Sequence, residues 1–304
     1  MPLIPVPVSR KEKDPAAGAA AGVPALHVAL QKVLPRFLRA LADAFLPVRC
    51  AACRAFLRSN RDEPGYPGSA GNGAGAALAG ACFLTSVVCR HCLNGFVPVE
   101  SPLCTVCGMP FKSREGDDHV CGECLKGPRH FRRARAAAVY TPMMMALVHA
   151  FKYNGRIHLA HPLGVVLAAA YRRFWPEADI DLILPVPLHR GRFRQRGFNQ
   201  AFLLVKDWAG TDTPSAGSAP TVAIAREAMT RIRPTTPQTG LGRQDRLQNI
   251  KKAFRVEKKQ VIEERRVLLV DDVYTTGATV DECAKTLLNG GAARVDVLTL
   301  VRAV

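Results

Sequence analysis

Downstream of residue 124 the hydrophobic residues fall into short continuous runs that alternate with stretches of three- and four-residue spacing. The continuous runs predict β-strands at 136–140, 181–187, 266–270 and 294–301. The spaced stretches predict helices at 142–152, 159–173 and 279–289, with a further helix starting near Asn199. Because strand, helix and strand follow one another near the C-terminus, we expect a βαβ unit within a mostly parallel α/β sheet with flanking helices.

The first part of the chain has a different pattern. At 26–46 hydrophobic residues recur at helical spacing around Pro35, which predicts a bent amphipathic helix. We expect this helix to pack on the cysteine-rich region that follows, and a membrane surface is the alternative. Residues 1–24 predict a flexible segment, and the low-complexity stretch 59–80 predicts a disordered insertion. The expected domains are the flexible segment 1–24, the helix and cysteine-rich region 25–131, and the α/β domain 132–304.

Eight of the ten cysteines form four C-x-x-C pairs, at Cys50/Cys53, Cys89/Cys92, Cys104/Cys107 and Cys121/Cys124. Two thiolates at this spacing hold one tetrahedral ion from a tight turn, and two such pairs complete a Cys₄ zinc shell. The sequence therefore predicts two structural zinc ions. Redox-active pairs and a disulfide framework are the alternatives, but redox pairs occur singly and disulfide frameworks belong to exported proteins.

Sequential pairing is the simplest arrangement of these cysteines. It gives one ion to the first and second pairs and the other ion to the third and fourth. A cross-braced arrangement, which joins the first and third pairs, stays open because the long gap between Cys53 and Cys89 imposes little restraint. Cys283 falls on the apolar face of the helix predicted at 279–289, so we expect a buried thiol there.

The charge balance points to a polyanionic partner. The chain has 42 Lys and Arg against 25 Asp and Glu, a formal net charge of +17, which favours nucleic acid or a phosphorylated ligand. No apolar run is long enough to predict a membrane-spanning helix. The proline-rich opening lacks the continuous apolar segment of a signal peptide, so we expect a cytoplasmic protein.

The sequence VLLVDDVYTTGATV at 267–280 carries the clearest chemistry. Asp271 and Asp272 follow an apolar strand, at the edge where open α/β sheets bind ligands. Small and hydroxyl residues then precede a helix, where N–H and O–H groups converge on a phosphate: Thr275, Thr276, Gly277, Ala278 and Thr279. Carboxylates beside a phosphate cradle suit a sugar diol or a magnesium ion. A polar turn without a ligand is the plain alternative.

This segment resembles the phosphoribosyl pyrophosphate signature of the type I phosphoribosyltransferases: four apolar residues, two acids, two further residues and T-T-G-x-T. PVPLHRGRFRQRGFNQA at 185–201, RPTTPQTGLGRQDRLQNIKKAF at 233–254, KYNG at 152–155 and the C-x-x-C pairs resemble the ComF family of competence-associated proteins. The resemblance runs from about Phe45 to the C-terminus. It implies a double zinc ribbon before a type I phosphoribosyltransferase-like fold, and a link to the uptake or processing of transforming DNA.

The same resemblance implies a site for phosphoribosyl pyrophosphate and Mg²⁺, with the 5′-phosphate on 275–279 and the ribose hydroxyls at Asp271 and Asp272. The family layout has a pyrophosphate-binding loop at 185–188, which favours Arg190 facing the site, and we expect a mobile lid at 235–247. The alternating arginines from Arg190 to Arg196 have two other interpretations, a solvated basic face or a contact with a nucleic-acid backbone.

Two functional hypotheses follow from these features. The first is a Mg²⁺-dependent phosphoribosyltransferase-like protein, which the complete loop favours. The second is a non-catalytic zinc-ribbon module that binds single-stranded DNA or a protein of the DNA-uptake machinery, which the charge of +17 favours. A purely structural scaffold leaves the loop unexplained.

Overall fold

The structure, a computed structural model, describes residues 48–57, 82–175, 179–208, 222–234 and 250–304. All of these residues belong to one compact unit of the chain, Val48–Val304. Several predicted segments lie outside the described residues, namely 1–24, the helix at 26–46, the insertion 59–80 and the lid at 235–247. No helix in the described part of the chain is both long and apolar enough to cross a membrane.

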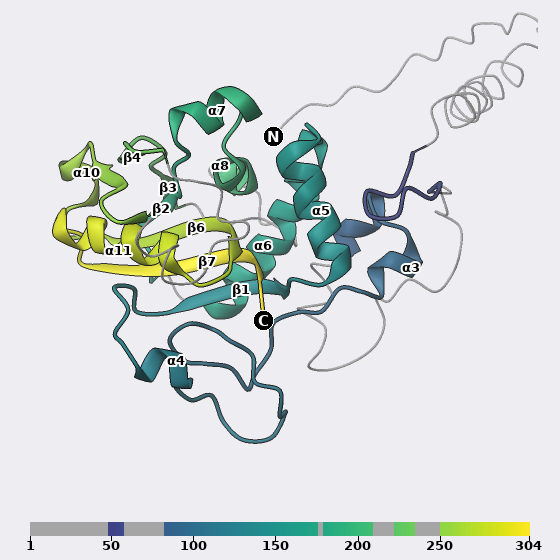
Figure 1. The fold of residues 1–304 in the computed structure, drawn as a ribbon, viewed down its shortest axis with the longest axis horizontal. Coiled ribbons are helices and arrows are strands. Elements are labelled where there is room, and N and C mark those ends of the chain that lie inside the picture. The colour runs from purple at the N-terminus through teal and green to yellow at the C-terminus, as the bar shows by residue number, and fades with distance from the viewer. Residues whose placement is uncertain (1–47, 58–81, 176–178, 209–221, 235–249) are drawn as a thin grey trace, which may run out of the picture. The chain divides into compact units, whose positions relative to one another are not determined.

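A parallel sheet of five strands forms the centre of this unit, in the order β1-β7-β6-β2-β3 (Figure 1). The strands span Ala134–Val139 (β1), Leu182–Pro185 (β2), Ala223–Ile224 (β3), Arg266–Tyr274 (β6) and Arg294–Arg302 (β7). Every neighbouring pair of strands is parallel. The predicted α/β class and the C-terminal βαβ unit are therefore confirmed.

Helices cover both faces of the sheet. The longer ones are Pro142–Tyr153 (α5), Ala160–Phe174 (α6) and Ala278–Asn289 (α11), and Gln200–Val205 (α8) starts after Asn199 as predicted. Successive side chains of a strand point to opposite faces. In β6, Leu268 and Val270 accordingly join the core that contains α5, α6 and α8, whereas Val267 and Leu269 join the core that contains α11. Burial on both faces explains why these strands read as continuous apolar runs.

Short elements complete the described fold. An antiparallel pair is formed by Met229–Arg231 (β4) and Phe254–Val256 (β5). The short helices are Arg90–Leu93 (α3), Gly122–Leu125 (α4), Arg190–Arg196 (α7) and Lys259–Ile262 (α10), with 3-10 turns at Phe83–Ser86 (η1), Ile157–Leu159 (η2) and Lys206–Trp208 (η3).

Strand β6 is longer than its apolar run. We predicted that it ends at Val270, but it continues to Tyr274 and keeps its pairing with β7 over this extension. The cause is the length of β7, which offers backbone partners as far as Arg302. The two adjacent acids, Asp271 and Asp272, therefore stand on a rigid strand and not in a loop.

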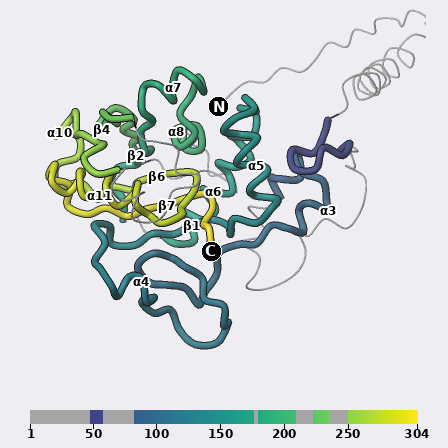
Figure 2. Tube along the Cα trace, in the orientation of Figure 1, coloured from purple at the N-terminus to yellow at the C-terminus, as the bar shows by residue number. Residues whose placement is uncertain are grey.

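The cysteine-rich segment covers the edge strand β1. Val139 N–H donates to the Val97 carbonyl at 2.8 Å, and Ala134 N–H donates to the Val106 carbonyl at 2.7 Å. Figures 1 and 2 show the segment around α4 running alongside β1. An exposed edge strand is a template for unwanted pairing. The cysteine-rich segment therefore protects the sheet as well as adding its own chemistry.

Aspartates at the amino-terminal edge of the sheet are paired with arginines. Arg266 donates to the two carboxylate oxygens of Asp181 at 2.7 and 2.9 Å, and these hydrogen bonds lower the pKa of Asp181 to about 2. Arg132 donates to Asp296 at 2.6 and 2.9 Å. The Asp296 side chain is fully buried and also accepts from the Trp175 indole N–H at 3.0 Å. These carboxylates have their partners within the fold.

Candidate phosphate-binding site

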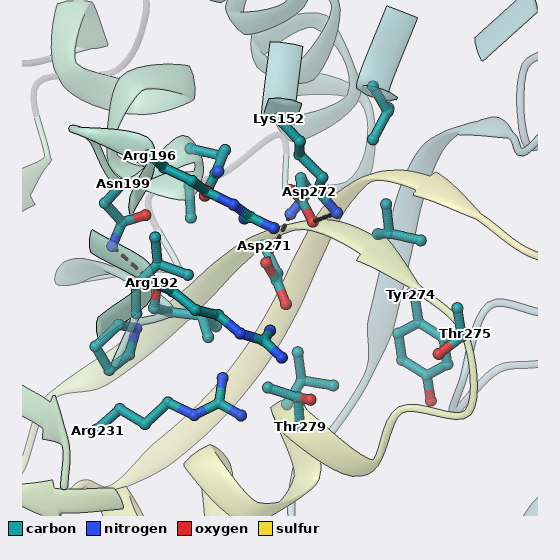
Figure 3. A pocket seen from close by; sticks show the side chains of 18 of the residues that line it. Lys152, Arg192, Arg196, Asn199, Arg231, Asp271, Asp272, Tyr274, Thr275 and Thr279 are labelled. Carbon is teal, nitrogen blue, oxygen red and sulfur yellow. Dashed lines mark hydrogen bonds and ion pairs between the residues drawn. The ribbon is translucent and has the colours of Figure 1, made fainter. Parts of the chain in front are cut away.

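A cavity of about 570 Å³ opens at the carboxyl-terminal end of the parallel strands. It is lined by residues of α5, the turn after β2, α7, the end of β6 and the first turn of α11 (Figure 3). Ligands of open α/β sheets bind at this edge, because loops and helix N-termini converge there. The cavity therefore lies where the sequence motif predicted a site.

The predicted phosphate loop forms one wall of the cavity. Thr275, Gly277, Ala278 and Thr279 line it, and α11 begins within the loop. Thr276 is not among the lining residues, and its hydroxyl accepts the Ala278 N–H at 3.4 Å. The positive end of a 12-residue helix therefore faces the cavity, as an anion site requires.

Only glycine fits at position 277. Its φ is +78°, a left-handed conformation that side chains with a Cβ rarely adopt. A Cβ at this position would also overlap the hydroxyl and ring of Tyr274, which lies buried beneath the loop. The glycine of the T-T-G-x-T pattern therefore has a second reason besides close approach of a ligand, because Tyr274 already occupies the space that a Cβ would need.

The two acids line the cavity in different environments. Asp272 is buried and pairs with Lys152, whose Nζ lies 2.9 Å from Oδ1. Burial, and then the neighbouring Asp272, raise the pKa of Asp271 to about 7. Burial alone lowers the pKa of Lys152, but Asp272 and Asp271 more than offset this and raise it. The pair therefore supplies one carboxylate held by a cation and one whose charge depends on what enters the cavity.

Four cationic side chains line the cavity against these two acids: Lys152, Arg192, Arg196 and Arg231. Figure 3 shows Arg192, Arg231 and Asp271 directed toward the same space. Burial, followed by the charge of Arg192, lowers the pKa of Arg231, and burial followed by Arg196 lowers that of Arg192. A cation whose pKa is lowered by a cationic neighbour favours an anionic ligand, because the charge of the ligand relieves the repulsion.

Arg190 does not have the place that we expected. It is exposed and is not among the residues that line the cavity, whereas Arg192 and Arg196 do line it. The reason is the helix α7, which the sequence analysis missed. Residues 190–196 form a helix and not an extended segment, and residues four positions apart lie on the same face of a helix. That face carries Arg192 and Arg196 to the cavity.

Sequence reasoning also missed the roles of Lys152 and Arg231. Lys152 opens the KYNG stretch, which carried the family resemblance without an assigned role. Its partnership with Asp272 joins distant parts of the chain and leaves no local pattern. Arg231 is 7% exposed and comes from the short strand β4, where nothing in the sequence marks it.

The cysteines form two clusters, Cys50, Cys53, Cys89 and Cys92 in the first and Cys104, Cys107, Cys121 and Cys124 in the second. Within each cluster the four sulfur atoms lie within 4.8 Å of one another. This is the sequential arrangement. The Sγ atoms of Cys53 and Cys89 are 3.6 Å apart, and those of Cys107 and Cys121 are 3.7 Å apart. A tetrahedral shell with Zn–S bonds of about 2.3 Å needs sulfurs at about this separation.

Backbone amides support the same interpretation. Cys89 N–H donates to Cys50 Sγ at 3.3 Å, and Cys121 N–H donates to Cys104 Sγ at 3.3 Å. Such bonds stabilise sulfur in its thiolate form, which is the form that binds a metal. The donor set, the spacing and the amide contacts of both clusters fit structural zinc.

The cysteine-rich part of the chain matches a known family. The Double zinc ribbon domain family matches residues 83–125. Purine phosphoribosyltransferase from Pyrococcus horikoshii shares 15% identity over 48% of this chain and 86% of that chain, with a TM-score of 0.26. The allosteric regulatory enzyme of purine biosynthesis shares 19% identity over 48% of this chain and 25% of that chain, with a TM-score of 0.28.

Sequence relatives are more informative. The DNA utilization protein YhgH of Shigella flexneri is 34% identical over 222 residues, which cover 71% of this chain and 90% of that protein. Competence protein F of Haemophilus influenzae is 31% identical over 71% of this chain and 96% of that protein. Competence protein ComFC of Bacillus subtilis is 28% identical over 71% and 84%. With its double zinc ribbon and these relatives, the chain belongs to the ComF family.

Proposed function

We propose that this protein binds phosphoribosyl pyrophosphate with Mg²⁺ in the cavity at the end of β6 and acts as a phosphoribosyltransferase-like protein of DNA uptake or use. The observation that carries the proposal is the complete signature at 267–280, displayed on one wall of a cavity that four cationic side chains also line. A polar turn without a ligand would not need a group of cations across from it.

Each part of the ligand has a matching part of the cavity. The 5′-phosphate is assigned to the loop 275–279 and the N-terminus of α11, as in the sequence hypothesis. The ribose hydroxyls donate to Asp271 and Asp272, of which Lys152 holds the second in place. Arg192, with Arg196 and Arg231, takes the pyrophosphate in place of Arg190.

This arrangement suits transfer at ribose C1. Pyrophosphate leaves as the C1–O bond breaks, the ribose passes through an oxocarbenium-like state, and an incoming nucleophile, typically a nitrogen, forms the new bond at C1. The cationic side chains that line the cavity hold the negative charge of the leaving group. The Asp271 carboxylate is a hard oxygen donor of the kind that Mg²⁺ prefers, and bound Mg²⁺ neutralises further pyrophosphate charge.

Two arginines of α7 give a matched test of this assignment. Arg192→Ala removes a cation from the cavity, and Arg190→Ala removes one from an exposed position of the same helix. In calorimetric titration with phosphoribosyl pyrophosphate and Mg²⁺, we expect Arg192→Ala to weaken binding about tenfold or more. Arg190→Ala should bind as the parent does. Equal affinities for the parent and the two variants would show that the pyrophosphate does not bind on this side of the cavity.

A screen of nucleobases with phosphoribosyl pyrophosphate, read by release of pyrophosphate, tests the catalytic part of the proposal. Release with one base and not with water identifies an acceptor. Binding of phosphoribosyl pyrophosphate without release by any base would make the site a sensor of the ligand.

The second candidate function is a DNA- or partner-binding module of the uptake machinery. The net charge of +17 and the names of the relatives, a DNA utilization protein and competence proteins, favour it. Affinity for single-stranded DNA measured against salt tests it, since several phosphate contacts give a steep log–log slope. We assign both functions to the cytoplasm, because clusters of cysteines without disulfides persist in a reducing compartment.

A further inference from the structure

The second cysteine cluster and the phosphate loop share two buried side chains. Arg302, at the end of β7, is 3% exposed and donates to the Cys107 carbonyl at 2.7 Å and to Cys107 Sγ at 3.4 Å. Its guanidinium carbon lies 4.2 Å from the centroid of the Tyr274 ring. Tyr274 in turn fills the space beneath Gly277. A continuous series of contacts thus runs from a predicted zinc ligand to the loop.

A second connection reinforces the first. The segment that follows the cluster places the Phe131 ring edge-on to Tyr274, with centroids 6.4 Å apart and planes at 83°. The preceding residue, His130, donates its backbone N–H to Asp281 in the first turn of α11 at 2.8 Å. Tyr274 is therefore held between Arg302 and Phe131, and the start of α11 is tied to the same segment.

Charge explains why metal at the cluster matters to these contacts. Four thiolates around Zn²⁺ carry a net negative charge, and Arg302 is a buried cation in contact with one of the sulfurs. A buried cation is tolerated when an anion accompanies it. Without the metal the four cysteines of the cluster are no longer held at one point, so the Cys107 carbonyl and sulfur that accept from Arg302 lose their fixed position. The stacking of Arg302 on Tyr274 then loses support.

We propose that Tyr274 and Arg302 are positioning residues, which hold the phosphate loop in place against the metal-bound second cysteine cluster. The first cluster has a different attachment. Cys50 packs in the core that contains α5, and the Thr141 hydroxyl at the start of α5 donates to the Gly95 carbonyl at 2.8 Å. Metal at the second cluster should therefore control the loop, and metal at the first should not.

The short helices α3 and α4 supply a matched pair of variants. Each begins after a cysteine, Cys89 or Cys121, and each carries the last cysteine of its cluster, Cys92 or Cys124. In the full chain, Cys124→Ser should speed amide hydrogen exchange over residues 274–284 by about tenfold. Cys92→Ser should leave this region unchanged. Equal effects of the two variants would show general loss of stability and would overturn the proposal.

Variants that keep the metal separate the link from the folding of the ribbon. Arg302→Met should retain two zinc ions by metal analysis and still speed exchange over 274–284, and Arg302→Lys should restore part of the protection. Tyr274→Phe keeps the stacked ring and should behave as the parent does, whereas Tyr274→Leu should not. Parent-like exchange in zinc-loaded Arg302→Met would contradict the proposal.

The consequence for binding rests on the proposed function. Arg302→Met should weaken binding of phosphoribosyl pyrophosphate with Mg²⁺ about tenfold, in parallel with the faster exchange. The two ideas fail separately. A parent protein that binds no phosphoribosyl pyrophosphate but shows the predicted exchange pattern would end the proposed function and leave the link standing, because exchange is measured without ligand.

Discussion

Aspartates at the two edges of the sheet have opposite environments. At the amino-terminal edge Asp181 is held by Arg266, and its pKa is lowered to about 2. At the carboxyl-terminal edge burial raises the pKa of Asp271 to about 7, and Arg192 and Arg231 line the same cavity. The bidentate ion pair with Arg266 satisfies the Asp181 carboxylate within the fold. The Asp271 carboxylate faces a space that a ligand can fill, so the comparison separates structural acids from binding acids.

The largest effect on stability is expected from the amino-terminal edge. Asp296→Ala leaves Arg132 and the Trp175 indole N–H without a fully buried partner. Arg132 is 40% exposed and keeps Asp179 as a partner, so the main cost is the buried indole N–H left without an acceptor, about 1–3 kcal/mol. Denaturant unfolding should show this loss. Calorimetry on the folded variant should show parent-like affinity for phosphoribosyl pyrophosphate, and a large loss of affinity would mean that the two edges are not independent.

The next effect concerns the loop at the other edge. Gly277→Val places a β-branched side chain at a φ of +78° and against Tyr274, so we expect about a hundredfold weaker ligand binding. Gly116→Val is the control, because Gly116 has a φ of +89° and a Cβ added there would meet no described atom within 4 Å. It should lose some stability and no affinity. Similar losses of affinity in both variants would make backbone strain, and not the site, responsible.

The smallest effect is a pH dependence with opposite signs at the two edges. The folded state raises the pKa of Asp271 to about 7, so ligand-free protein loses stability as pH rises from about 4 to 7. Asp271→Asn should avoid this loss. On going from pH 4 to pH 8, the free energy of unfolding of the variant should therefore rise relative to that of the parent by at least about 1.4 kcal/mol. Unfolding curves at the two pH values measure the difference, and an unchanged difference would contradict the environment assigned to Asp271.

Asp181→Asn supplies the contrast. Hydrogen bonds from Arg266 lower the pKa of Asp181, so its carboxylate stabilises the fold above about pH 4 and this contribution is lost as pH falls toward 2. The variant should therefore be less stable than the parent at neutral pH and approach it in acid. A variant as stable as the parent at pH 7 would show that the pairing contributes nothing.

The sequence predicted those parts of the molecule that local pattern specifies. The apolar run before Asp271 has the short length and the valines typical of a buried strand, and the turn and helix that follow have their own signals, so the βαβ unit was predictable. The spacing of the C-x-x-C pairs similarly indicated two metal clusters. Both kinds of signal lie within a few residues of one another along the chain.

The rest depends on contacts that the sequence does not mark. The apolar run alone gave no reason to extend β6 to Tyr274, since that extension depends on pairing with β7. Helix α7 is polar on most sides, and without its periodicity Arg190 could not be told from Arg192. Lys152 and Arg231 reach the cavity from α5 and β4 by tertiary packing, which no local window contains.

The central claim is that Asp271 and Asp272 bind the ribose of phosphoribosyl pyrophosphate. Calorimetric titration of the parent and of the variant that combines Asp271→Asn and Asp272→Asn tests it directly, with Asp181→Asn as the control at the opposite edge. Each lost charge-assisted hydrogen bond costs about 1.5–3 kcal/mol, so the double variant should bind about a hundredfold more weakly or worse. Zinc content should stay at the parent value and Asp181→Asn should bind normally. Equal binding by the parent and the double variant would place the ligand elsewhere, and a parent that binds no phosphoribosyl pyrophosphate would contradict the account.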